Sequence, residues 1–200
     1  MGRRREEPLH RRWTMKDVLI PLAQGCEELE AVTVIDLLRR AGLEVVVAGV
    51  DEAVEVRASR GTRLLPDVAL DAVVNDDFRL VVLPGGLPGA DHLAADERVL
   101  GLLRRTHEAG QWVAAICAAP KVLARAGLLD GRRATSYPGA LEGLDVAGLD
   151  YREEPVVVDG RVVTSRGPGT AMDFALTLIE CLQGPQSRAE VEGPLLRPGC

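Results

Sequence analysis

Three short stretches of the chain combine residue types that could do chemistry. The first centres on Cys117, which lies between the apolar run 111–116 and a run of small residues, in "VAAICAAPK". A thiol at a helix N-terminus is close to unpaired N–H groups and to the positive end of the helix dipole, and both favour the reactive thiolate. A buried, inert cysteine at a strand–helix junction is the alternative, and the local sequence leaves both interpretations open.

The second stretch is "LPGG", which ends in Gly85 and Gly86. Glycines lack a Cβ atom, so their backbone can approach a reacting atom closely, and their N–H groups could form an oxyanion hole. A tight turn that leads into the next helix explains the same residues without any chemistry.

The third stretch is "EELE", which places three carboxylates at the start of an expected helix. Acidic residues in a first turn complement the helix dipole, which accounts for Glu27 and Glu28. Glu30 differs because it shares a face with Val34 and Leu37, which should point inward. Burial would raise its pKa, so that it could donate a hydrogen bond to a thiolate or act as a general acid. A glutamate exposed on the flank of the helix is the competing interpretation.

Other catalytic or metal-binding arrangements find little support. The four cysteines form no C-x-x-C pair and lie near no histidine cluster, so the sequence predicts neither a zinc site nor a structural disulfide. Of the histidines, His10 is in the N-terminal extension, His107 is expected at the far end of its helix, and His92 follows the glycine loop. No histidine directly follows Cys117, which disfavours a Cys–His dyad.

The elements that must position these residues alternate between strands and helices. Strands are predicted at 17–23, 43–50, 78–86 and 111–116, and helices at 27–42, 96–110 and 119–127. Such βαβ units form a parallel sheet, whose ligands bind beyond the carboxyl ends of the strands. All three chemical stretches fall at those ends, so we expect them to converge.

The remaining segments complete a single α/β domain. A small hairpin or edge excursion is expected over 53–66, further strands at 132–137, 155–159 and 161–165, and a closing helix over 170–184; "DGR" makes the hairpin turn between the last two strands. We therefore predict a doubly wound α/β domain over 15–185, preceded by a disordered basic extension (1–14) and followed by a C-terminal tail (186–200).

Composition excludes several classes of protein. The chain is 46% hydrophobic with a formal net charge of −6, which argues against a nucleic-acid partner. No apolar run is long enough to span a membrane, and the basic N-terminus has no apolar signal region. We expect a cytoplasmic protein.

Four motifs together resemble the ThiJ/PfpI superfamily, specifically its parkinsonism-associated deglycase branch with YajL-like bacterial members. They are "LAQGCEELEAVTVIDLLRRAG", "VVLPGG", "AAICAAPKVLARAG" and "TSRGPGTAMDFAL", and they occur in the family order over residues 16–184. The resemblance implies a flavodoxin-like three-layer sandwich that forms a homodimer. It also implies that Cys117 is the reactive, easily oxidised cysteine, that Glu30 is a protonated glutamate beside it, and that the N–H groups of Gly85 and Gly86 face it.

The resemblance further implies three residues that contact substrate. Arg60 matches an arginine that reaches the pocket from the partner subunit. Ala118 stands where protease-like members carry their catalytic histidine, and Tyr137 stands where animal members often carry a different histidine. Cys26 replaces a small residue, and we raise the hypothesis that it resolves an oxidised Cys117.

The implied function is a cysteine-dependent enzyme, a glyoxalase or deglycase of hydro-lyase or hydrolase type, that converts a small reactive aldehyde such as methylglyoxal to lactate. Neither a metal nor an organic cofactor is required. The alternative is an oxidative-stress sensor or chaperone in which oxidation of Cys117 is the signal. A cysteine peptidase or amidase is the weakest reading, because Ala118 replaces the histidine.

Overall fold

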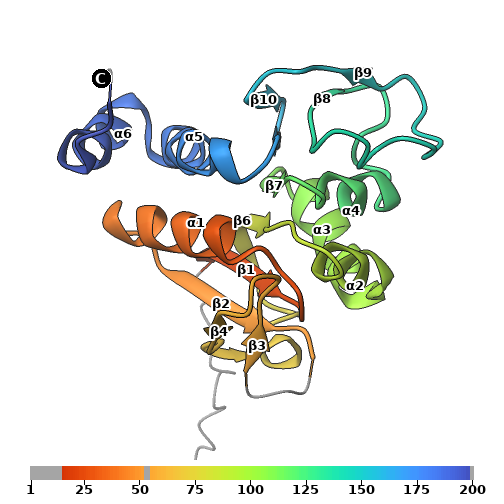
Figure 1. Cartoon of the computed structure of the whole chain (residues 1–200), viewed down its shortest axis with the longest axis horizontal. Coiled ribbons are helices and arrows are strands. Elements are labelled where there is room, and N and C mark those ends of the chain that lie inside the picture. Colours follow the sequence, from red (N-terminus) through yellow and green to blue (C-terminus); the bar gives the residue numbers. More distant parts are fainter. Residues whose placement is uncertain (1–14, 52–54, 199–200) are drawn as a thin grey trace, which may run out of the picture.

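A seven-stranded sheet forms the centre of the molecule (Figure 1). The computed structural model describes residues 15–51 and 55–198. In spatial order the strands are β10 (Val156–Asp159), β11 (Val162–Ser165), β7 (Trp112–Ile116), β6 (Phe78–Leu83), β1 (Lys16–Leu22), β2 (Val45–Gly49) and β5 (Val68–Ala69). All neighbouring strands pair in parallel except β10 and β11, which form the antiparallel hairpin predicted at "DGR".

Helices cover both faces of this sheet, as the prediction of a doubly wound α/β fold requires. One face is covered by α1 (Glu28–Arg40) and α5 (Ala171–Gln183), and the other by α2 (Gly89–Ala95), α3 (Glu97–Glu108) and α4 (Pro120–Arg125). Alternate residues of each strand point to opposite faces, so that Val18 and Ile20 join the first core and Leu19 joins the second. Because both faces are buried, the strands are continuous apolar runs.

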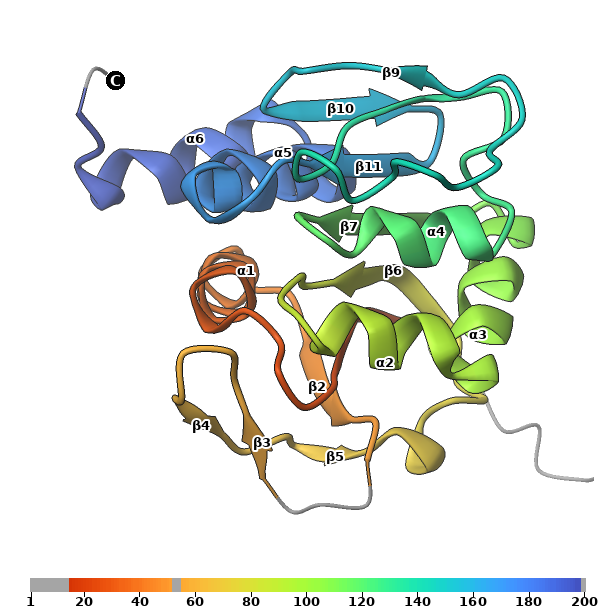
Figure 2. The same ribbon diagram turned by 45° about the vertical axis from the view of Figure 1, so that its right-hand side comes forward.

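Two small sheets stand outside the main one. The excursion predicted over 53–66 contains a hairpin of β3 (Val56–Arg57) and β4 (Arg63–Leu64), which lies below α1 in Figure 2. The strand predicted at 132–137 is shorter than expected, because only β8 (Arg133–Ala134) forms a strand there. It pairs with β9 (Asp150–Tyr151). Residues 135–137 turn instead toward the end of β7, where Tyr137 N–H donates to the carbonyl of Cys117.

Two helices differ from the prediction. The sequence pattern does not predict α2, because Pro88 and Gly89 weaken the helical pattern at its start. The residues expected as a C-terminal tail (186–200) include most of α6 (Pro185–Glu192), which packs against α5 and buries Val191. Residues 1–14, expected to be a disordered extension, lie outside the described residues, as do residues 199–200. The three 3₁₀ turns of the described chain are Leu70–Ala72, Pro168–Thr170 and Gly193–Leu195.

Candidate active site

Cys117 lies directly after β7, in a backbone conformation that is unusual for a residue other than glycine. Its φ is 64°, in the left-handed region. Its N–H donates to the carbonyl of Ser165 at 3.0 Å, and its own carbonyl accepts from Tyr137 N–H at 2.8 Å. The side chain is 9% exposed. The sharp turn therefore presents the thiol at the carboxyl end of the sheet, as expected for a nucleophile elbow.

Glu30 is fully buried in the first turn of α1, as are Val34 and Leu37 further along the same face. The inward-facing interpretation of this glutamate is therefore correct. Its Oε2 accepts a hydrogen bond from Gly85 N–H at 2.8 Å. Its Oε1 is buried and has no hydrogen-bond partner among the described residues. The Cys117 side chain lies beside this carboxyl, because both lie against Gly85. The thiol lowers the pKa of Glu30, and the charge of Glu30 raises the pKa of Cys117.

Gly85 lies between these two side chains, and only glycine fits there. A Cβ atom at this position would lie 2.6 Å from the Cβ of Cys117 and 2.8 Å from Oε2 of Glu30. The adjacent Gly86 has φ 88°, and a Cβ there would lie 2.4 Å from the backbone nitrogen of Glu27. The "LPGG" loop is thus threaded between α1 and the cysteine, which explains its two glycines by close approach rather than by turn formation alone.

The geometry revises the roles expected of the backbone amides. We expected the N–H groups of Gly85 and Gly86 to face the cysteine, but Gly85 N–H is already committed to Glu30. The backbone N–H groups that lower the pKa of Cys117 are instead those of Gly86 and Ala118. Ala118 therefore affects Cys117 through its backbone N–H group. The identity of its side chain could not indicate this role.

Both acidic groups of the site have raised pKa values. Burial raises the pKa of Glu30 to about 7, although the hydrogen bond from Gly85 opposes this. Burial, followed by the charge of Glu30, raises the pKa of Cys117 to about 12. This differs from the expectation of a thiolate favoured by the helix N-terminus, because α4 begins only at Pro120 and burial outweighs the dipole. At neutral pH the pair therefore carries at most one negative charge, and the higher pKa of Cys117 places that charge mainly on Glu30.

Three other predicted residues lie around this centre. Arg60 is exposed on the β3–β4 hairpin, and its side chain makes no hydrogen bond or ion pair within the described part of the chain. Tyr137 contributes its backbone to the elbow while its side chain is largely exposed. Cys26 is fully buried, and burial together with the charge of Glu28 raises its pKa to about 12. Such a thiol is a poor candidate for the resolving role that we considered.

Glu28, for which the sequence indicated only an interaction with the helix dipole, holds the hairpin that carries Arg60. The Glu28 carboxylate accepts hydrogen bonds from the N–H groups of Arg60 (3.0 Å) and Thr62 (3.3 Å). Burial alone would raise its pKa, but backbone hydrogen bonds, including those from Arg60 and Thr62, lower it to about 2. Sequence patterns could not reveal this contact, because the partners lie more than thirty residues apart.

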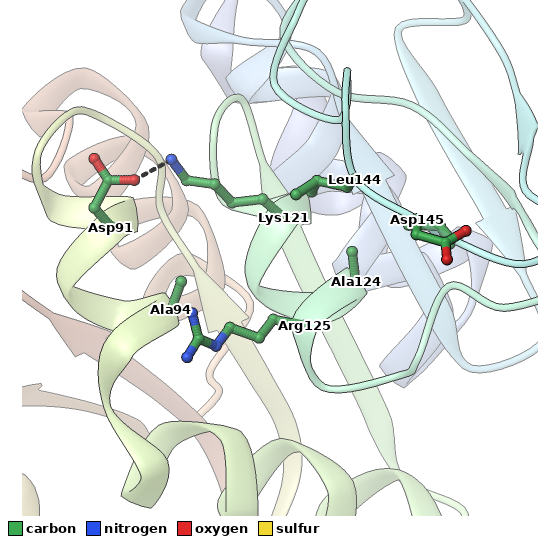
Figure 3. Close-up of a pocket in the computed structure, with 8 residues that line it drawn as sticks. Asp91, Ala94, Lys121, Ala124, Arg125, Leu144 and Asp145 are labelled. Carbon is green, nitrogen blue, oxygen red and sulfur yellow. Dashed lines mark hydrogen bonds and ion pairs between the residues drawn. The ribbon is translucent and has the colours of Figure 1, made fainter.

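A separate surface pocket of about 530 Å³ lies between α2 and α4. Figure 3 shows Asp91 and Lys121 facing one another there as an ion pair, with Arg125 beside Ala94. These helices cover the sheet face opposite α1, which carries Glu30, so the pocket is distinct from the cysteine site.

Residues 15–51 and 55–198 contain neither a metal-binding cluster nor a membrane-spanning helix. No group of three or more His, Cys, Asp or Glu side chains in these ranges is placed to hold a metal ion. None of their helices is long and apolar enough to cross a membrane.

The fold and the site together define a class: a doubly wound α/β protein with a strained cysteine at a strand–helix elbow beside a buried glutamate. Residues 16–181 match the model of the DJ-1/PfpI family, and the chain belongs to that family. It is 45% identical over 182 residues to the protein dj-1beta of Drosophila melanogaster, covering 90% of this chain and 97% of that protein. It is 38% identical over 183 residues to the Caenorhabditis elegans protein named glutathione-independent glyoxalase DJR-1.2, covering 92% and 94%.

Solved structures agree with the fold. The crystal structure of Drosophila melanogaster DJ-1beta superposes with a TM-score of 0.86 at 43% identity, covering 92% of this chain and 98% of that one. A structure of oxidized DJ-1 from Toxoplasma gondii gives a TM-score of 0.85 at 39% identity, covering 92% and 99%. The predicted mostly parallel α/β architecture is thereby confirmed.

Proposed function

We propose that this protein is a cysteine-dependent enzyme that converts small α-oxoaldehydes such as methylglyoxal to hydroxy acids without glutathione. The observation that carries the proposal is the juxtaposition of Cys117 and Glu30. A strained cysteine lies beside a fully buried carboxyl whose second oxygen has no hydrogen-bond partner among the described residues. The name of the Caenorhabditis elegans relative supports the same chemistry.

The reaction begins from the minor form of the singly charged pair, in which Glu30 holds the proton and Cys117 is the thiolate. The sulfur adds to the aldehyde carbon, forming a C–S bond as the C=O π bond breaks, and the carbonyl oxygen takes the proton of Glu30 to give a hemithioacetal. Glu30 is then a carboxylate. The N–H groups of Gly86 and Ala118, which lower the pKa of Cys117, would stabilise the developing oxyanion.

Glu30 then transfers a proton between the two substrate carbons. Its carboxylate removes the proton from the former aldehyde carbon and returns it to the neighbouring ketone carbon, while the hydroxyl proton moves from the first oxygen to the second, which gives a thioester of a hydroxy acid. Water cleaves the thioester and returns the thiol. The aldehyde carbon is oxidised and the ketone carbon is reduced by the same electron pair, so the sum is methylglyoxal plus water giving lactate, with no external oxidant.

The decisive experiment measures lactate formed from methylglyoxal without glutathione. We expect Cys117→Ala to abolish the reaction and Glu30→Gln to slow kcat by roughly 10²–10⁴-fold, the usual contribution of a general acid–base. Cys181→Ala is the matched control, because Cys181 lies on α5 and should leave the rate unchanged. Activity that survives Cys117→Ala would refute the enzyme proposal, and an unaffected Glu30→Gln variant would refute the proton-transfer role.

A second candidate function is oxidation sensing at Cys117. The N–H groups of Gly86 and Ala118, which lower the pKa of Cys117, could also bind the oxygens of an oxidised cysteine. Mild peroxide treatment followed by mass spectrometry would detect oxidation confined to residue 117. A peptidase role has no comparable support, since His92 contacts the carbonyl of Gln24 rather than the cysteine.

We also propose a homodimer formed through α1. Leu29 and Val32 are 50% and 46% exposed on this helix, and Met172 is 45% exposed at the start of the neighbouring α5. Apolar side chains gathered on two adjacent helices are suited to burial against a second copy. In such a dimer Arg60, which has no side-chain partner in its own described chain, would be available to the partner's site.

A further inference from the structure

One motif that marks the family resemblance has no role in the chemistry described above. "TSRGPGT" spans residues 164–170, from the end of β11 to the residue before α5. Within the sheet, Ser165 lies opposite Ile116, the residue that precedes Cys117. The motif therefore lies beside the elbow, although the reacting groups come from other segments.

Its hydroxyl groups form a connected chain of hydrogen bonds. Ser165 Oγ donates its single proton to the carbonyl of Pro155 at 2.7 Å. The single proton of the Thr170 hydroxyl faces two acceptors, Ser165 Oγ at 2.7 Å and the carbonyl of Gly167 at 3.0 Å. Thr170 Oγ1 in turn accepts from the N–H of Gly167 at 3.1 Å. The peptide of Ser165, which is buried, is thus fixed through its own side chain.

This fixed peptide is the one that holds the cysteine. The carbonyl of Ser165 accepts the N–H of Cys117 at 3.0 Å, and Tyr137 N–H binds the Cys117 carbonyl from the other side. A non-glycine residue keeps a left-handed conformation only where the surrounding structure over-determines it. The two hydrogen bonds to the Cys117 peptide groups supply that constraint.

We propose that the hydroxyl groups of Ser165 and Thr170 are positioning groups for the nucleophile. They lock the Ser165 carbonyl, which locks the Cys117 backbone in the conformation that directs its thiol toward Glu30 and Gly85. Neither hydroxyl touches the reacting atoms. The catalytic consequence rests on the proposed function, whereas the positioning of the thiol does not.

The test compares three variants. Thr170→Val removes the hydroxyl and keeps the volume, and Thr170→Ser restores a hydroxyl. Thr177→Val is the matched control, because its hydroxyl is on the adjoining helix and donates only to the carbonyl of Asp173 at 2.8 Å. If Thr170→Val does not fold, Ser165→Ala takes its place with the same readouts.

Two readouts separate positioning from simple loss of stability. In Thr170→Val we expect kcat for methylglyoxal to fall roughly tenfold to a hundredfold with KM unchanged, as misplacement of a reacting group produces. We also expect the pH profile of Cys117 alkylation, followed by mass spectrometry of its peptide, to move toward the ordinary thiol pKa of about 8.5. Thr170→Ser and Thr177→Val should keep the wild-type profile.

An alkylation profile in Thr170→Val that matches that of Thr177→Val would overturn the proposal, whatever the activity. If wild-type protein forms no lactate, the proposed function fails. The alkylation profile still decides whether the hydroxyl pair positions Cys117.

Discussion

Glu30, Gly85 and Cys117 come from three segments and pack directly against one another at the candidate site. Gly85 N–H holds one oxygen of Glu30, while the other oxygen remains for the Cys117 thiol. Any side chain at Gly85 would collide with both partners. This arrangement keeps an ionisable carboxyl away from water, which costs stability whenever that carboxyl is charged.

That cost predicts a pH dependence of folding. Glu30 has an ordinary pKa of 4.5 and a folded value of about 7. As pH rises through this window the unfolded chain loses the proton first, so the free energy of unfolding should fall by about 3 kcal/mol and then level off. Glu30→Gln should lack this decrease, whereas the exposed control Glu44→Gln should retain it. Urea unfolding at pH 4.5 and 8 measures both, and an undiminished decrease in Glu30→Gln would contradict the assignment.

At the scale of elements, the β3–β4 hairpin depends on the start of α1 for its placement. It lies outside the main sheet and is tied to the segment before α1 by backbone hydrogen bonds from Ser59 N–H to the Cys26 carbonyl and from Gly25 N–H to the Arg57 carbonyl. The Glu28 carboxylate adds charge-assisted hydrogen bonds at the tip. The same segment contacts the glycine loop, since Glu27 N–H donates to the carbonyl of Gly85.

Removing the charge of Glu28 should therefore loosen the hairpin tip and leave the core intact. In Glu28→Gln we expect the amides of Arg60 and Thr62 to exchange with deuterium roughly tenfold faster, as expected when a hydrogen bond to a charged group is weakened. Amides of β1 and β6 serve as internal controls, and Glu44→Gln as the control variant. Unchanged exchange at residues 60 and 62 would show that the backbone contacts alone hold the hairpin.

At the scale of the whole molecule, the outer surface of the α1–α5 layer carries a group of exposed apolar side chains. The layer of α1 and α5 leaves Leu29, Val32 and Met172 exposed, and the proposed dimer would bury them. Val32→Lys places a charge in that surface, and we expect it to convert a dimer to a monomer in sedimentation velocity. Leu144→Lys, on the α2–α4 side of the molecule, should leave the dimer unchanged. A Val32→Lys variant that sediments like wild type would exclude α1 as the interface.

The sequence alone determined the alternation of strands and helices and the meeting of three chemical stretches at one edge of the sheet. These follow from local periodicity and from the rule that parallel strands align their carboxyl ends. Burial of Glu30 was predictable for the same reason, since its face of α1 continues with Val34 and Leu37.

Other features were decided only by contacts between distant segments. The commitment of Gly85 N–H to Glu30, the hold of Glu28 on the hairpin, and the placement of the Ser165 carbonyl against Cys117 each join residues 32 or more positions apart. The raised pKa values have the same origin, because desolvation depends on every segment packed around a group. Local pattern thus places a residue on a face, but only the folded chain determines which atoms share a proton or a hydrogen bond there.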